Sequence, residues 1–454
     1  MSSNNPDSLR SRVLNATGWA VGQHGLTQLL RFLANLLLTR LLVPEMFGLM
    51  VVANILIAGM TMFSDIGLNM HLIQHKRGAD RSFINTAWTV QIIRGLILSV
   101  ITLLLAYLVV KQEHLFPEGS VYSNPELPTV LAILAISPLI DGFKSTKLAI
   151  SDRNMDMKSV AKVHLVSQVV GLTVMVLGAL AYSSIYALIA GGLISKSMTV
   201  ALSHLSLKGT NNRLHWDSNK ASELFHFGKW IFITSILGFL VANGDRLLLA
   251  LYIDASTLGI YSIAVALINI ILGMGSSITD RVGFAALSDI ARNNPGRLRE
   301  IYYRIRLPLD AIFLFIAGML FMVGNSVVDW FYDDRYSIAG NMVEILSFSI
   351  IFSRYSLYLK LNTAIGKPRL NVPVNLINLL ALYCLLPVGV SLVGLQGSLW
   401  VIALYKAASI PFIFYLKVKS GVLDIARECY VFGFYLIGLL IGYITNLIYI
   451  AYIG

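Results

Sequence analysis

The chain has 454 residues, of which 56% are hydrophobic and 13% are charged, and its formal net charge is +11. This composition lies far outside that of soluble globular proteins, and nucleic-acid binding has no support beyond the charge of the loops. Apolar runs of about 20 residues recur along the whole chain, which is typical of membrane-spanning helices. We therefore expect an all-α polytopic membrane protein.

The apolar runs predict about thirteen transmembrane helices, within a range of about 12–14. Their expected starts lie near Leu14, Phe47, Phe83, Leu127, Val160, Ile185, Leu224, Leu258, Leu307, Met342, Leu370, Gly397 and Tyr430. Basic residues collect in alternate loops, and the loops between them are short or acidic. This alternation follows the positive-inside rule and places the N-terminus in the cytoplasm. Most of the net positive charge therefore reflects membrane topology.

The two halves of the chain show a weak repeat. Trp19 and Trp230 are separated by the same interval as Gly48 and Gly259, each glycine lying between two apolar residues. Six helices precede the seventh, so the repeat is parallel and predicts two six-helix lobes with a binding site at their interface. The predicted parts are a cytoplasmic N-terminus (1–13), an N-lobe (14–207), a cytoplasmic linker (208–223), a C-lobe (224–420) and an additional C-terminal helix (421–454).

The first predicted helix carries a polar stripe made of His24, Gln28, Arg31, Asn35 and Thr39. At 100° per residue these side chains fall within roughly 80° of one another, and the rest of the segment is apolar. An arginine near the middle of a bilayer costs about 2.5–3.5 kcal/mol, so it should face protein or water. The stripe indicates a hydrated, cationic cavity. The alternative is that Arg31 forms a pair within its own lobe.

The second predicted helix has a matching stripe that includes Asn54, Thr61 and Asp65. A short turn around Pro44 joins it to the first helix, so the two stripes can line one cleft. Asp65 lies near the inner boundary of the membrane, where pairing with Lys76 is the alternative to a role in the cavity.

The seventh predicted helix places Asn243 and Arg246 on one face. Under the repeat, Arg246 corresponds to Asn35, one turn outward from Arg31. Two guanidinium groups facing each other across the lobe interface would bind a diphosphate, because each planar fork can hold two phosphate oxygens. Snorkelling of Arg246 towards the outer surface is the alternative.

Five charged or titratable residues are additional candidate cavity groups. The alternatives are snorkelling or a structural ion pair for the three cations near mid-span, a solvated position for the arginine at the inner mouth, and an ordinary hydrogen-bonded helix position for the histidine. The five residues are His24, Arg94, Lys196, Arg281 and Lys406.

The sequence lacks the motifs that a catalytic or cofactor-binding protein would need. There is no phosphate-binding loop of the G-x-x-x-x-G-K-[ST] type and no H-E-x-x-H pattern. Cys384 and Cys429 have no metal-ligand spacing. These absences predict a transporter rather than an enzyme, with no cofactor and no bound metal. Coupling to H⁺ or Na⁺ stays open, with Asp65, Asp245 or a histidine as the candidate groups.

Residues 36–49, 63–68 and 72–74 resemble the opening of bacterial polysaccharide repeat-unit flippases, and residues 243–249 and 258–261 are similar to the second half of that family. These are the Wzx-type exporters of O-antigen and exopolysaccharide in the MATE-like MOP superfamily. The resemblance implies two six-helix lobes that alternate between inward-open and outward-open states. Related lipid II flippases place arginines from the first helix and the second lobe in the cavity, and Arg31 and Arg246 are the matching positions.

The resemblance also implies a cargo, a location and partners. The cargo would be a glycan on an undecaprenyl pyrophosphate carrier, flipped across the bacterial inner membrane. A polysaccharide polymerase, a chain-length regulator and membrane lipids would be the partners.

The composition leaves two alternative functions. A multidrug or metabolite antiporter of the same fold would need buried carboxylates for cationic drugs, whereas the charges within the spans here are mainly basic. A membrane glycosyltransferase or polymerase would need a larger extramembrane loop.

Overall fold

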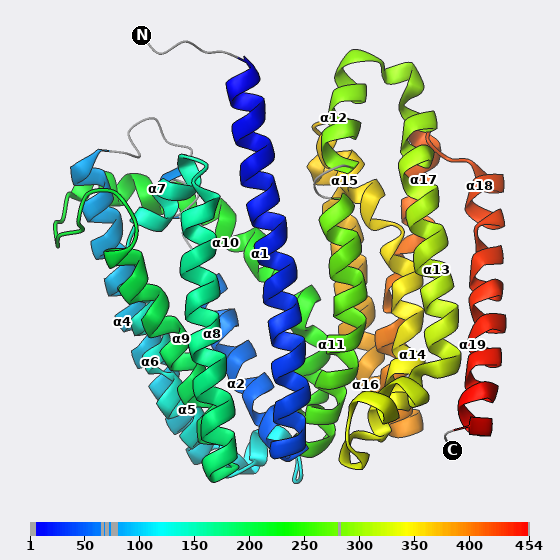
Figure 1. Ribbon diagram of the computed structural model, residues 1–454, viewed down its shortest axis with the longest axis horizontal. Helices are drawn as coiled ribbons and strands as arrows, with labels where there is room; N and C mark the ends of the chain where they lie inside the picture. The colour runs from blue at the N-terminus through cyan, green and yellow to red at the C-terminus, as the bar shows by residue number, and fades with distance from the viewer. Residues whose placement is uncertain (1–5, 65–67, 69–71, 74–79, 280–282, 453–454) are drawn as a thin grey trace. The chain divides into compact units, whose positions relative to one another are not determined.

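The computed structural model describes residues 6–64, 68, 72–73, 80–279 and 283–452, and within these residues every regular element is a helix. The all-α prediction is therefore confirmed. The chain divides into two compact units, Met1–Phe239 (the N-unit) and Leu240–Gly454 (the C-unit), and the division falls inside one long helix, α10. Figure 1 gives the helix labels used below.

The N-unit contains long apolar helices and several short ones. They are α1 (Pro6–Leu41), α2 (Pro44–Phe63), α4 (Arg81–Lys111), α5 (Leu127–Leu134), α6 (Ile136–Gly142), α7 (Lys147–Arg153), α8 (Met157–Tyr182), α9 (Ile185–Leu205) and the first part of α10 (Ser218–Leu249), with 3₁₀ turns at Glu113–Leu115 and Val121–Ser123. α5 and α9 begin at the residues where the apolar pattern predicts a new span.

The C-unit continues α10 and adds the second set of helices. They are α11 (Ala255–Ile278), α12 (Phe284–Asn293), α13 (Leu298–Phe331), α14 (Ile338–Ser353), α15 (Ser356–Ala364), α16 (Asn371–Leu404), α17 (Ile410–Lys419), α18 (Ile425–Tyr430) and α19 (Phe432–Tyr452), with 3₁₀ turns at Pro295–Arg297, Asp334–Tyr336, Pro368–Leu370 and Tyr405–Ser409. α13 begins nine residues before the predicted start at Leu307, and this additional segment buries Tyr302, Tyr303 and Arg306.

Nine helices within the described residues are long and apolar enough to cross a membrane. Leu127–Gly142 and Lys147–Arg153 meet at 55° and together have the length and apolarity of one further span, either a broken span or a re-entrant loop. α1 and α10, which have 36 and 32 residues, are also long enough to cross a bilayer. The protein is therefore a multi-pass membrane protein.

The turn at Gly394 divides α16 into two helices. Its φ of 65° and ψ of −143° are readily adopted only by glycine. On either side of it, Gly389 and Gly397 approach so closely that a side chain at Gly397 would collide with the carbonyl of Gly389. The chain therefore folds back here, three residues before the predicted start of a span at Gly397.

The segment between α9 and α10 is held against the N-unit by hydrogen bonds. Asn212 donates to Thr146 (2.6 Å) and accepts from Ser145 (2.7 Å). The backbone N–H of Arg213 donates to the side chain of Asn85 (3.0 Å). The part of the predicted linker that follows α9 therefore covers the break between α6 and α7.

Candidate functional site

The polar stripe of α1 lies on the side of the helix away from its most exposed leucines. Arg31 and His24 are exposed, and Gln28 and Asn35 are partly buried. At 100° per residue the centre of the stripe lies nearly opposite a ridge of leucines that are 45–53% exposed. That ridge is formed by Leu26, Leu29, Leu33 and Leu37. The exposed leucines provide a surface suited to lipid, so Arg31 does not share that surface.

α1 packs against α8 next to the stripe. The carbonyl of Thr27 accepts a hydrogen bond from the side chain of Gln168 on α8 (3.0 Å), and Ala34 and Leu38 are buried. Within the described residues the guanidinium group of Arg31 forms no hydrogen bond or ion pair. The pairing of Arg31 within its own lobe, which the sequence left open, is therefore not seen in this part of the chain.

The stripe of α2 is only partly described. Asn54 is exposed. Thr61 is partly buried, and its hydroxyl donates to the carbonyl of Ile57 (2.8 Å). Asp65 lies outside the described residues.

Two of the additional predicted charges bind partners inside the N-unit. Arg94 donates to the hydroxyl of Ser64 (2.9 Å) and to the carbonyl of Thr61. Lys196 forms an ion pair with Asp141 (2.7 Å) and also contacts the hydroxyl of Ser137. A structural ion pair, one of the two alternatives for Lys196, is therefore present.

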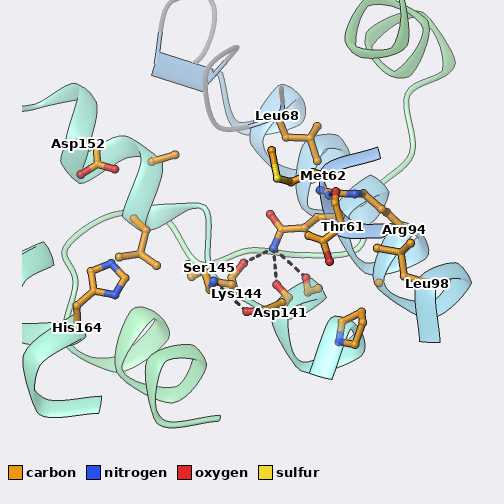
Figure 2. Close-up of a pocket in the computed structure, with 16 residues that line it drawn as sticks. Thr61, Met62, Leu68, Arg94, Leu98, Asp141, Lys144, Ser145, Asp152 and His164 are labelled. Atoms are coloured by element: carbon orange, nitrogen blue, oxygen red, sulfur yellow. Dashed lines mark hydrogen bonds and ion pairs between the residues drawn. The ribbon is translucent and has the colours of Figure 1, made fainter. Parts of the chain in front are cut away.

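The N-unit contains a cavity of about 390 Å³ between α2, α4, α6, α7 and α8 (Figure 2). Its ionisable lining residues are Arg94, Asp141, Lys144, Asp152 and His164. Lys144 is one of the basic loop residues that follow the positive-inside pattern, and no sequence motif singles out Asp141 or Asp152. Their shared location depends on the helix break, which the apolar pattern does not reveal.

Gln91 stabilises the helix break beside this cavity. Its side-chain amide donates to the carbonyls of Asp141, Gly142 and Lys144 at 3.0–3.1 Å. Carbonyls at the end of a helix lack partners within that helix, and an unsatisfied carbonyl in an apolar environment is costly. One amide from α4 therefore allows α6 to end inside a membrane-length segment.

The predicted residues of the C-unit lie in two places on its helices. Asn243 and Arg246 are partly buried in α10, and the guanidinium group of Arg246 forms no hydrogen bond or ion pair within the described residues. Its neighbour Asp245 accepts a hydrogen bond from the hydroxyl of Tyr261 (2.6 Å). The ammonium group of Lys406 lies 5.6 Å from the centre of the Tyr405 ring. Arg281 lies outside the described residues.

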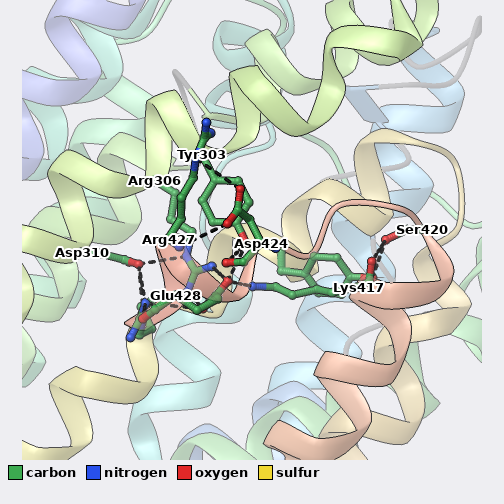
Figure 3. Close-up of polar contacts among 10 residues, drawn as sticks. Tyr303, Arg306, Asp310, Lys417, Ser420, Asp424, Arg427 and Glu428 are labelled. Carbon is green, nitrogen blue, oxygen red and sulfur yellow. Dashed lines mark hydrogen bonds and ion pairs between the residues drawn. The ribbon is translucent and has the colours of Figure 1, made fainter. Parts of the chain in front are cut away.

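A second group of charges, not predicted from sequence, is buried in the C-unit (Figure 3). Glu428 accepts from Lys417 (2.6 Å), from Tyr303 (2.8 Å) and from both terminal nitrogens of Arg306. Asp310 pairs with Arg306 (3.0 Å) and with Arg354 (3.1 Å). We call Arg306, Asp310, Arg354, Lys417 and Glu428 the C-unit ion network.

The C-unit ion network is inaccessible, because each of its side chains is at most 4% exposed. It joins α13, α17 and α18 to Arg354, which lies between α14 and α15. Three cations meet only two carboxylates, and aromatic rings surround them. The ring centres of Tyr302, Tyr355 and Tyr358 lie 5.3–5.6 Å from the ammonium group of Lys417. This arrangement connects helices and offers no room for a ligand.

Several solved structures share the fold of this chain. The model matches the lipid II flippase MurJ in an inward closed conformation with a TM-score of 0.72 and 14% identity, covering 95% of this chain and 98% of that one. It matches an inward-facing multidrug resistance MATE family transporter with a TM-score of 0.59 and 15% identity, covering 88% and 95%. The protein therefore has the two-lobe helical fold of the MOP superfamily.

Sequence comparisons identify the family. A family model described as "Polysaccharide biosynthesis protein" matches residues 37–339. The lipopolysaccharide biosynthesis protein WzxC of Escherichia coli (strain K12) is 22% identical over 341 residues, which cover 75% of this chain and 67% of WzxC. An uncharacterized membrane protein in the cps region of Klebsiella pneumoniae is 23% identical over 305 residues, or 66% of this chain and 60% of that protein. The chain belongs to the family of polysaccharide biosynthesis proteins, and its resemblance to Wzx-type flippases is confirmed.

Proposed function

We propose that the protein moves an undecaprenyl-pyrophosphate-linked oligosaccharide repeat unit across the bacterial inner membrane by alternating access. This step would supply the synthesis of O-antigen, capsule or exopolysaccharide. The proposal rests mainly on the location of Arg31 and Arg246 and on the interactions of their guanidinium groups. Both arginines lie on helices of membrane-spanning length, and neither guanidinium group has a hydrogen-bond or ion-pair partner within the described residues.

Each arginine would bind the pyrophosphate through two parallel hydrogen bonds, because its planar fork matches two phosphate oxygens. Gln28, Asn35, Asn54, Thr61 and Asn243 would bond sugars or water through neutral polar groups. The exposed leucines of α1 lie on the opposite side of that helix from Arg31, so the polyprenyl tail could stay in lipid while the head group stays with the stripe.

The test is replacement of Arg31 in cells that depend on this protein for surface glycan. We expect Arg31→Ala to lower surface polysaccharide about tenfold or more, because a charge-assisted hydrogen bond contributes about 1.5–3 kcal/mol. Arg31→Lys should retain part of the export, since it keeps the charge and loses the fork. Immunoblots of the membrane fraction would show whether the amount of protein is unchanged.

The control is Arg40→Gln. Arg40 is exposed in the last turn of the same helix and lies on the leucine side rather than on the stripe. Surface polysaccharide should stay at the wild-type level in this variant. Normal export by Arg31→Ala would remove Arg31 from the mechanism.

The second candidate function is export of drugs or metabolites, and the likeness to a MATE transporter fold is its only support. A cationic drug would be repelled by unpaired arginines. Resistance to cationic drugs upon overexpression, without any change in surface glycan, would favour this candidate over the flippase.

A further inference from the structure

Two titratable side chains that line the N-unit cavity have no partner within the described residues. Asp152 and His164 line it, and their side chains form no hydrogen bond or ion pair within the described residues. The other ionisable lining groups have partners. Asp141 forms ion pairs with Lys144 (3.0 Å) and Lys196 (2.7 Å), and Arg94 donates a hydrogen bond to Ser64. Asp152 and His164 are thus the lining groups that are free to exchange a proton.

The cavity is large enough and polar enough to hold water. A volume of about 390 Å³ accommodates several water molecules, and its polar lining supplies hydrogen-bond partners for them. α7 presents Leu148, Ala149 and Asp152 to it, at the spacing of one helix face. Figure 2 shows Asp152 and His164 on the side of the cavity formed by α7 and α8.

We propose that this cavity is a proton-binding site, in which the imidazole of His164 takes a proton from a hydronium ion and the carboxylate of Asp152 stabilises the imidazolium that forms. One water molecule is released for each proton bound. Histidine is the side chain whose charge changes most readily near neutral pH. The proposed use of this proton, to drive transport, rests on the proposed function.

A proton fits the site better than a metal cation does. Lys144 and Arg94 line the same cavity and would repel a metal ion. Within the described residues, no group of three His, Cys, Asp or Glu side chains could hold one. A proton needs only one lone pair, which the imidazole provides.

The charges around His164 determine whether protonation of its imidazole is favoured or opposed. The charged groups that line the cavity with His164 are Arg94, Asp141, Lys144 and Asp152. Further cations on α7 are bonded elsewhere, since Lys147 donates to the carbonyl of His204 (2.9 Å) and Arg153 to the carbonyl of Leu72 (2.9 Å). Neighbouring helices also carry Lys196 and His204 on α9, Lys158 and Lys162 on α8, and His24 and Arg31 on α1. The cations oppose an imidazolium. Asp141 is already shared by two lysines, so Asp152 is the carboxylate left to offset a new positive charge.

Protonation would also act on the helix break. The imidazolium would be a second cation beside Lys144 and would weaken the ion pair between Lys144 and Asp141. Asp141 immediately precedes Gly142, where α6 ends. Interrupted helices in transporters commonly carry coupling-ion sites. The charge of His164 and the geometry at the break would therefore change together.

The first experiment measures the proton directly and needs no glycan. Full-length protein with isotope-labelled histidine rings, reconstituted in nanodiscs, would be titrated by NMR from about pH 5 to pH 8.5. The His164 signal, assigned by its loss in His164→Gln, should shift with pH. Asp152→Asn should lower the protonated fraction of His164 at a fixed pH at least twofold. The matched controls are Asp156→Asn, which keeps the cap of α8, and His204→Gln, since His204 is bonded to the carbonyl of Phe143 (2.9 Å).

The second experiment measures coupling in proteoliposomes that contain a pH-sensitive dye. The probe is a polyprenyl pyrophosphate carrying one N-acetylglucosamine. With wild-type protein, transport of the probe should move protons, and His164→Gln should lower this proton flux at least tenfold while His204→Gln leaves it unchanged.

The outcomes separate the two proposals. A His164 signal that does not move with pH, or that does not respond to Asp152→Asn, overturns the proton site. Probe transport by wild-type protein without proton flux overturns the coupling role and leaves the flippase function standing. If wild-type protein moves no probe while His164 titrates as described, the flippase proposal fails and the proton site is upheld.

Discussion

Charged side chains inside the two units are arranged in opposite ways. In the N-unit they line a cavity, and the carboxylate of Asp141 remains 31% exposed between its lysines. In the C-unit they form a sealed network in which Glu428 is 4% exposed and contacts three cations. A charge within an apolar helix is therefore no indicator of transport by itself. The space beside the charge decides between a role in packing and a role in chemistry.

The largest expected effect is in the C-unit ion network. Glu428→Gln leaves three buried cations with a single carboxylate, and we expect a loss of about 3–5 kcal/mol in the free energy of unfolding. Lys417→Met should cost less, because it leaves two cations with two carboxylates. Chemical denaturation of both purified variants would check the order. Equal losses of unfolding free energy in the two variants would contradict the explanation that unbalanced positive charge destabilises the network.

The next effect concerns the helix break of the N-unit. Gln91→Leu removes the donor that three carbonyls share, and we expect a loss of about 1–3 kcal/mol. Gln91→Glu is the informative companion, because a carboxylate accepts hydrogen bonds and cannot donate to these carbonyls. If Gln91→Glu were as stable as wild type, the three hydrogen bonds would not be what holds the break.

A smaller effect is expected for Asp141→Asn. Asp141 and Lys196 are 31% and 40% exposed, so water screens their ion pair, and we expect a loss of about 1 kcal/mol or less. The comparison with Glu428→Gln tests the contrast between the units directly. A loss as large as that of Glu428→Gln would show that the N-unit charges serve packing too.

The smallest effect is a pH dependence at two partly exposed helix caps, one in each unit. The backbone N–H of Arg427 holds the pKa of Asp424 below its usual value of 3.8, and that of Lys220 does the same for Asp217. A lowered pKa in the folded state stabilises the protein above pH 4 or so, and this contribution is lost as the pH falls further. Asp424→Asn keeps a cap and loses the charge, so its melting temperature should fall less between about pH 6 and pH 3 than that of wild type. An identical acid response would contradict this.

The positions of the helices could be read from the sequence to a large extent, because apolar length is a local property. The starts of α5 and α9 were predicted to the residue, and the turn at Gly394 falls just before an expected start. The early start of α13 was missed since Arg306 and its neighbours make the segment look like a loop. Their burial depends on Glu428, more than 100 residues away.

The candidate site could be predicted only where it follows a helix face. The stripe through Arg31 repeats along one helix and is visible in the sequence. The cavity around His164 requires the break after Gly142, and that break depends on hydrogen bonds from Gln91, about 50 residues earlier in the chain. No local sequence pattern predicts hydrogen bonds between residues that are so far apart in the chain.

The attachment of α19 makes the C-terminal helix part of the C-unit. Gly438 and Gly442 meet the backbone of α13 at Phe315 and Met319, and Gly318 meets the carbonyl of Tyr435. Small residues let the two helices approach closely along their length, and Glu428 anchors the preceding turn. A spectroscopic label on the outer face of α19, for instance at the exposed Tyr443, would therefore report the movement of the whole C-unit. Together with a second label at the exposed Tyr182 of the N-unit, it would allow the distance between the two units to be measured during the transport cycle.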